Sequence, residues 1–202
     1  MAQRKGVCDF TVADIEKDDS GNYSATNLTK LMKAASAKIK LKYTSEFVYF
    51  DDIVDEIDQD FEGGEIELEG DYLTAEIVER IRGHKNLNGM SVTNAEDKAN
   101  DVCILFRSKM TNGKYKFYCF YRVNFGAEEE EDFEGIGKKA KRQNTKIKGT
   151  IMARKKDNLV KVDASETEFI SGGVTDAADI LKAWFTKVPE PSTITVPEKT
   201  QK

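Results

Sequence analysis

The pair Asn112-Gly113, set between two apolar-rich runs, restricts the fold of this chain more than any other feature. Asn-Gly at the centre of a two-residue loop is a strong signal for a β-hairpin. In such a hairpin, residues at equal distances from the turn lie opposite each other, so that Val102 faces Val123. One face is then almost entirely apolar and belongs to the core; it comprises Val102, Ile104, Phe106, Ser108, Met110, Tyr115, Phe117, Cys119, Tyr121 and Val123.

The opposite face of this hairpin is mixed in character and suits a half-covered surface or a contact between subunits. It carries Cys103, Leu105, Arg107, Lys109, Lys116, Tyr118, Phe120 and Arg122. In this register Cys103 and Cys119 point to opposite faces, so we expect no disulfide between them. The three cysteines also match neither a disulfide framework nor a zinc pattern.

Other segments alternate between apolar and polar residues with a period of two, as half-buried strands do. They are residues 10–15, 37–50, 65–69 and 145–151. A turn at 18–22 separates the first from a returning segment that begins at Tyr23, whereas residues 27–35 look partly helical. Short strands separated by turn signals predict a mainly β fold, an antiparallel β-sandwich or barrel-like structure.

Two helices interrupt the strands. Thr74 is a good N-cap, Leu73 and Val78 form a hydrophobic staple, and Gly83 ends the first helix, which we expect to flank one end of the sandwich. A short C-terminal helix is predicted from about 175 to 186, before Pro189. We expect a single domain over 1–190 and a flexible tail over 191–202.

The charges of the chain are separated although its formal net charge is only −5. Residues 43–79 hold fourteen acidic side chains and no Lys or Arg, while residues 138–161 hold ten basic side chains and one acid. Such separation indicates surfaces that associate, and the expected partners are other copies of the same chain.

The densest acidic segment spans residues 51–62. Its acids are Asp51, Asp52, Asp55, Glu56, Asp58, Asp60 and Glu62. A short helix is one reading because its apolar residues fall at helical spacing, but we favour a projecting hairpin or loop that orders on assembly. A second acidic run, within 126–137, is typical of a solvated loop.

The sequence offers little for catalysis. The only histidine, His84, follows a helix end, where we expect it to meet free carbonyl groups. The acidic cluster lacks the glycine of a calcium loop, and no nucleophile elbow or phosphate-binding loop is present. The basic segment 138–142 lacks interleaved aromatic residues and better fits an acidic surface on a neighbouring subunit than a nucleic acid. We therefore expect neither an enzyme nor a cofactor or metal, and no membrane anchor.

The order of these features resembles the major tail protein, or tail tube protein, of long-tailed bacteriophages. The similarity covers roughly residues 37–191 and depends on order and spacing. It is carried by the segments Phe47–Asp52, Gly63–Leu68, Thr74–Gly83, Ile104–Tyr121, Phe133–Thr150 and Trp184–Phe185.

The resemblance implies a structural virion protein. Six copies would close into a ring, and stacked rings would form a hollow tube in the virion tail, after synthesis in the bacterial host cytoplasm. The implied partners are further copies of itself and the tape measure, tail terminator and tail tip proteins. One long loop reaches the next ring in such a family, a role that falls here on residues 51–62.

DNA would pass through this tube without specific binding, because an acidic wall repels a duplex whereas a basic wall would hold it. We expect Glu65, Glu67 and Glu69 to line the lumen, with an ordinary solvated strand face as the alternative. The basic strand face of Lys146 and Lys148 is expected to turn outward or against a neighbour. Subunit contacts are expected for Arg107, Lys109 and Lys116.

Two rival functions remain open at this point. A tube subunit of a contractile injection or secretion machine would share the sandwich and the ring. A monomeric β-sandwich binding module would need exposed aromatic residues, for which Tyr118 and Phe120 are the candidates. Mass in solution separates the module from the tube subunits.

Overall fold

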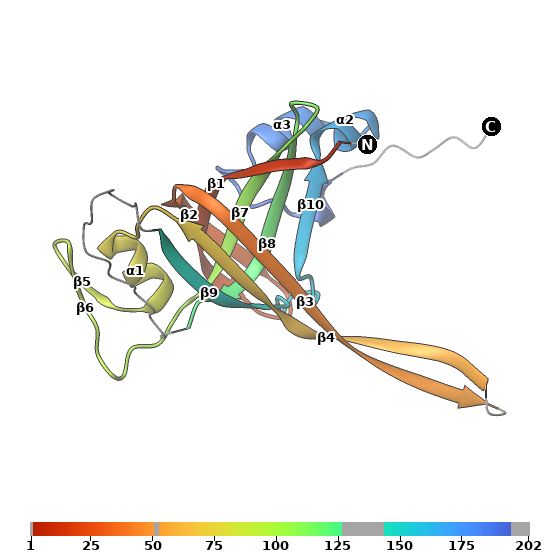
Figure 1. Cartoon of the computed structure of the whole chain (residues 1–202), viewed down its shortest axis with the longest axis horizontal. Helices are drawn as coiled ribbons and strands as arrows, with labels where there is room; N and C mark the ends of the chain where they lie inside the picture. Colours follow the sequence, from red (N-terminus) through yellow and green to blue (C-terminus); the bar gives the residue numbers. More distant parts are fainter. Residues whose placement is uncertain (1, 51–52, 127–143, 195–202) are drawn as a thin grey trace, which may run out of the picture.

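A computed structural model describes residues 2–50, 53–126 and 144–194. Figure 1 shows an antiparallel β-structure with a few short helices and one long projecting hairpin. The strands are β1 (Arg4–Asp18), β2 (Tyr23–Met32), β3 (Ala34–Phe50), β4 (Ile53–Gly70), β5 (Lys85–Leu87), β6 (Met90–Val92), β7 (Asp101–Met110), β8 (Tyr115–Asn124), β9 (Thr145–Met152) and β10 (Lys161–Ser165). The helices are α1 (Ala75–Arg82), α2 (Glu166–Ser171) and α3 (Ala177–Lys182), followed by the 3-10 turn η1 (Pro191–Thr193).

Eight of the ten described strands form one sheet in the order β2-β1-β7-β8-β9-β4-β3, with β10 also paired to β8. The sheet bends over on itself, so that side chains of β1, β2, β7 and β8 meet those of β4 and β9 in one cluster. Helix α1 adds Ile77 and Ile81 to this cluster. The predicted mainly β, antiparallel, sandwich-like class is therefore confirmed, and residues 27–35, expected to be partly helical, belong instead to β2 and the start of β3.

The hairpin of β7 and β8 forms as predicted, but its register differs by one residue. Ile104 lies opposite Phe120 and Phe106 opposite Tyr118, because the connection is a three-residue loop of Thr111, Asn112 and Gly113. Gly113 has a φ of 80°, typical of the left-handed residue that closes such a loop. A register shift between Val102 and Ile104 restores the predicted pairing at the far end.

Both faces of β7 and β8 are consequently buried, which corrects the expectation of one mixed, half-covered face. Ile104, Phe106, Tyr118 and Phe120 point into the cluster shared with β4, β9 and α1. The opposite face packs against the C-terminal part of the chain in a second cluster, which includes Cys103, Leu105, Phe117, Cys119, Tyr121, Leu181 and Trp184.

The C-terminal part is more divided than predicted. Helix α3 is confined to Ala177–Lys182, and α2 was not anticipated. Trp184 follows α3, is buried, and donates its indole N–H to the carbonyl of Tyr118 over 3.3 Å. Of the expected tail over 191–202, residues 191–193 form η1, and residues 195–202 lie outside the described part of the chain.

Helix α1 has the predicted ends. The Thr74 hydroxyl accepts from the backbone N–H of Ile77, and Gly83 takes a φ of 73° as the helix ends. The hairpin β5–β6 follows it as a separate two-stranded sheet. Its turn holds a second Asn-Gly pair, Asn88-Gly89, with φ of 52° and 98°, as a type I′ turn requires.

Candidate assembly surface

The hairpin of β3 and β4 extends well beyond the body of the protein (Figure 1). Strand β9 pairs with β4 only from Gly64 to Gly70, so among the described residues only β3 and β4 form the hairpin beyond Gly63. A register shift marks its base, where Lys42 pairs with Gly63 but Tyr43 pairs with Phe61. We call residues 43–50 and 53–62 the arm. Its strand content favours the predicted projecting hairpin over the alternative short helix.

One face of the arm carries two largely exposed apolar pairs, with the polar pair of Ser45 and Gln59 between them; we call it the apolar face of the arm. Tyr43 lies opposite Phe61, with ring centroids 5.5 Å apart, and Phe47 lies opposite Ile57. The side chains of Tyr43, Phe47 and Ile57 are 55%, 54% and 51% exposed. An isolated two-stranded hairpin is at best marginally stable in water, so this face is suited to burial against another surface.

The other face of the arm is acidic. Glu46 lies opposite Asp58 and Thr44 opposite Asp60, with Glu56 and Glu62 on the same strand, all but Thr44 exposed. Like charges directly opposite each other destabilise a strand pair, so the arm is not optimised for stability on its own. Of the remaining acids expected to form the inter-ring loop, Asp51 and Asp52 lie outside the described residues, and Asp55 lies within β4.

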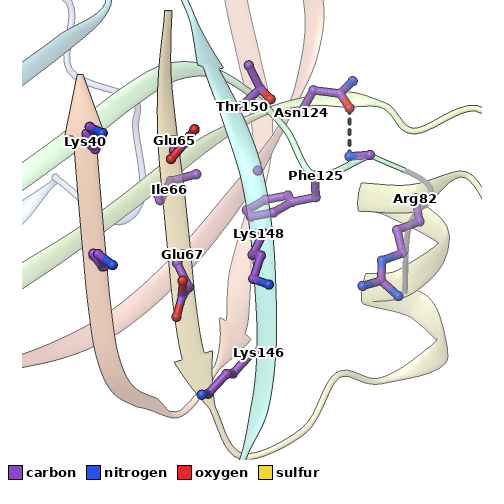
Figure 2. Close-up of a pocket in the computed structure, with 13 residues that line it drawn as sticks. Lys40, Glu65, Ile66, Glu67, Arg82, Asn124, Phe125, Lys146, Lys148 and Thr150 are labelled. Carbon is purple, nitrogen blue, oxygen red and sulfur yellow. Dashed lines mark hydrogen bonds between the residues drawn. The ribbon is translucent and has the colours of Figure 1, made fainter. Parts of the chain in front are cut away.

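The three glutamates expected to line a lumen lie on the outer face of β4, between two rows of lysines. Glu67 pairs with Lys38 of β3 and Lys148 of β9, and Glu69 pairs with Lys146 of β9. Figure 2 shows Glu65 and Glu67 of β4 between Lys40 on one side and Lys148 on the other. The pairing of β4 with β9 places both sets on one face, so the glutamates cannot line a lumen while Lys146 and Lys148 turn outward. Contact of these lysines with a neighbouring subunit stays a prediction. We call this surface the striped face.

The striped face is held together by local contacts. Lys42 binds Glu65, and this hydrogen bond and charge lower the pKa of the Glu65 carboxyl. Hydrogen bonds from Asn144 and Ser36, at 3.0 and 2.8 Å, lower the pKa of Glu69. The acidic row is thus largely compensated within the molecule.

A hollow of about 960 Å³ adjoins the striped face. Its lining joins Lys40, Glu65, Glu67, Lys146 and Lys148 to Arg82 and Phe125 (Figure 2). Because both signs of charge alternate across this lining, it is better suited to contact a protein surface than to select a single ion.

The remaining residues expected at subunit contacts have different environments. Arg107 forms an ion pair with Asp9 at 2.6 Å and lies 4.2 Å from the ring centroid of Tyr115. Lys116 binds Asp163 at 2.8 Å, and this hydrogen bond raises its pKa. Lys109 is exposed. Contact with a second subunit would therefore compete with existing partners of Arg107 and Lys116, and only Lys109 is presented openly.

Sequence reasoning missed a buried arginine that fastens the C-terminal segment. Arg154 is fully buried, with Nε and Nη2 bound to Asp157 at 2.7 and 2.6 Å, and Nη1 and Nη2 bound to Glu190 at 2.9 and 2.8 Å. Its guanidinium lies 4.4 Å from the ring of Tyr121 and 5.0 Å from that of Tyr23. We call these five residues the arginine latch. No local sequence pattern announces it, because its members come from four distant segments.

The residues of the arginine latch stabilise one another in their charged forms. Burial disfavours the charged guanidinium, but the hydrogen bonds that it donates to Asp157 and Glu190 outweigh burial and raise the pKa of Arg154. Its reciprocal bond lowers the pKa of Asp157 to about 2. The hydroxyl of Tyr121 donates to the carbonyl of Pro189 over 2.7 Å, so the same cluster holds the backbone beside Glu190.

Cys103 and Cys119 were expected on opposite faces, and this expectation is wrong. The changed register brings both into the second cluster, with their Sγ atoms 3.6 Å apart and both thiols fully buried and free. Burial raises the pKa of Cys119 well above its ordinary value. Both thiols are therefore inert toward solvent reagents as long as the core is closed.

The described residues contain no group of three or more His, Cys, Asp or Glu that could hold a metal ion. His84 is buried with its Nδ1 3.3 Å from the hydroxyl of Thr93, rather than meeting the carbonyl groups at the helix end. Within the same described ranges, no helix combines the length and apolar character needed to cross a membrane. No family model matches the chain, and no curated protein sequence matches it either.

Proposed function

We propose that this chain is the structural subunit of a self-assembling tube of the kind built by long-tailed bacteriophages. The arm is the observation that carries the proposal. It is a two-stranded hairpin that leaves the body with an exposed apolar face, formed by Tyr43, Phe47 and Ile57. In a monomer such a face promotes aggregation, whereas in a subunit whose arm lies on a neighbour it is buried in the contact.

Assembly through the arm is heterologous, since a hairpin of one copy meets a different surface of the next. Heterologous contacts generate closed rings or open filaments. A tube of stacked rings contains closed contacts within each ring and open-ended contacts from ring to ring. In this proposal the tail tape measure, terminator and tip proteins are further partners of the tube, and DNA passes through it in the virion tail.

The acidic wall that such a tube needs is better supplied by the arm than by β4. Glu65, Glu67 and Glu69 share their face with lysines on both sides, whereas the acidic face of the arm carries Glu46 and Asp58 with no basic residue between positions 43 and 62. We propose that the acidic face of the arm, rather than the striped face, repels the DNA phosphates.

The test is electron microscopy of the purified protein at high concentration, beside its mass by light scattering. Rings or hollow tubes are expected. A protein that stays monomeric at every concentration would refute the proposal and favour a monomeric binding module.

The wall assignment has its own test in assembled tubes. Triple reversal Glu46→Lys, Asp58→Lys and Asp60→Lys is expected to make the tubes retain labelled duplex DNA in a salt-dependent manner, whereas wild-type tubes release it. The matched control reverses Glu65, Glu67 and Glu69. If the control retains DNA and the arm variant does not, the lining belongs to β4.

A further inference from the structure

We infer that the apolar face of the arm binds the β5–β6 hairpin of a second copy of this chain. This inference deepens the proposed function and rests on it, since it names the surface that receives the arm. We call residues 85–92 the receiving hairpin.

The receiving hairpin carries the matching chemistry. Leu87 and Met90 lie opposite each other beside the Asn88-Gly89 turn, and they are 49% and 64% exposed. Among the described residues outside the arm, the other large exposed apolar side chains are Tyr72 and Ile170, on separate elements. Leu87 and Met90 are thus an adjacent exposed apolar pair on the body of the molecule, comparable to the pair of Phe47 and Ile57 on the arm.

The two hairpins also differ in charge. Lys85 is the one charged residue between positions 85 and 92, whereas the arm carries acids and no Lys or Arg. The acids of one arm repel those of a second arm, whereas the exposed Lys85 offers them an opposite charge, so encounter with the receiving hairpin is favoured over encounter between two arms.

Their positions exclude a contact within one molecule and favour one between molecules. The arm lies at one end of the long axis of the molecule, and the receiving hairpin lies beyond α1 at the other end (Figure 1). A copy that lays its arm on the receiving hairpin of the next leaves its own receiving hairpin open for another arm. The contact therefore propagates from copy to copy, as a ring or tube requires.

The β5–β6 hairpin is itself incomplete. Its strands have three residues each and belong to a separate two-stranded sheet, not to the main sheet. Such a short ribbon gains stability when a further apolar surface covers it. In the described part of the chain, both partners of the proposed contact are therefore two-stranded hairpins with exposed apolar side chains, although α1 packs against part of the receiving hairpin.

Cross-linking between two different variants tests this pairing. In a Cys8→Ser background, Ile57→Cys and Met90→Cys proteins are purified separately, mixed under assembly conditions, and treated with a short bis-maleimide. A covalent dimer is expected from the mixture and not from either variant alone. The control pair, Asp58→Cys with Met90→Cys, places the arm thiol on the acidic face. It is expected to cross-link about tenfold less, which corresponds to a free-energy difference of about 1.4 kcal/mol.

The outcomes separate the two proposals. Tubes that form normally, but give no more dimer from the Ile57 pair than from the control pair, overturn the receiving hairpin and leave the tube intact. A wild-type protein that never assembles overturns both.

A further variant tests the contact without a cross-linker, because two thiols can also react after a chance encounter. Met90→Asp changes an exposed side chain, so the circular dichroism spectrum and the Trp184 fluorescence are expected to match those of the wild type. Its critical concentration for assembly is expected to rise about tenfold or more. An unchanged critical concentration would refute the inference.

Discussion

Replacing Arg154 with methionine gives the sharpest test of how the C-terminal segment is attached. Methionine is unbranched and fills similar space, so the substitution removes the charge and the hydrogen bonds while keeping much of the packing. It leaves the carboxylates of Asp157 and Glu190 without the guanidinium between them, and only Lys156, 3.5 Å from Glu190, remains as a nearby cation.

The magnitude follows from the geometry of the latch. Breaking a buried ion pair by removal of one partner costs about 3–5 kcal/mol. The Asp157 and Glu190 side chains are 43% and 21% exposed, so water can reach them and the lower end of about 3 kcal/mol applies. Loss of the contacts with the rings of Tyr121 and Tyr23 adds about 1 kcal/mol. We expect the variant to lose about 4 kcal/mol in total, a large part of the stability of a typical domain.

The assay is equilibrium unfolding in urea, followed by the emission of Trp184. This residue is the only tryptophan of the chain and is buried beside the same core, so its emission shifts when the C-terminal segment detaches. Lys155→Met, at the exposed neighbouring position, is the matched control and is expected to change the stability by about 0.5 kcal/mol or less.

A triple variant adds a second constraint on the same reasoning. Arg154→Met combined with Asp157→Leu and Glu190→Leu removes all three charges, and is expected to recover much of the loss because no uncompensated carboxylate remains. A loss below about 1 kcal/mol in Arg154→Met alone would show that the latch does not hold the segment.

Three further predictions concern other parts of the molecule. Since the folded pKa of Asp157 lies at about 2, below its ordinary value, the stability that this group contributes is present above about pH 4 and is lost as the pH falls toward 2; acid titration of the urea midpoint should therefore fall less steeply in Arg154→Met than in the wild type. Ellman's reagent should label the partly exposed Cys8 in the native protein and the two buried thiols only after unfolding, so rapid native labelling of all three would contradict the closed core. Gly83→Ala should lose about 2 kcal/mol or more on thermal unfolding, because the residue has a φ of 73° and a Cβ there would come within 2.2 Å of the carbonyl oxygen of Lys98, whereas Gly89→Ala, with a positive φ but open space, should lose less.

Elements whose signals are local could be predicted from the sequence. Thr74 and Gly83 mark both ends of α1 because a cap depends on a few consecutive residues. The period of two in residues 37–43 and 145–151 likewise predicts β3 and β9, since alternation reports one wet and one dry face.

The register of β7 and β8 shows where such signals end. Asn112-Gly113 indicates a turn but does not say whether the loop has two or three residues. A loop longer by one residue shifts the pairing by one and so moves the side chains of the following strand to the opposite face, up to the next register shift. That single step moved Cys119 to the same face as Cys103. The Asn88-Gly89 pair, by contrast, forms the two-residue turn that its sequence suggests, and this pair is the local signal for the β5–β6 hairpin.

The striped face could not be foreseen for a different reason. Alternation predicts that Glu67 and Lys148 each lie on a polar strand face, but only the pairing of β4 with β9 decides that these faces are one. The arginine latch has the same origin, since Tyr23, Arg154 and Glu190 meet only in the folded chain. Non-local contacts of this kind leave no periodic trace in the sequence.

The continuity of β3 and β4 gives the arm a mechanical role. These strands have 17 and 18 residues and stay paired from the arm into the core, with a register shift at the base of the arm, over a length of roughly 55 Å at about 3.3 Å per residue. A pull on the arm along the strand axis would load the β4–β9 hydrogen bonds in shear, all at once, rather than peel them apart one by one. Tension applied at one subunit would reach the cores of its neighbours through stiff strands, so a chain of such subunits could bend as a whole while each joint stays closed.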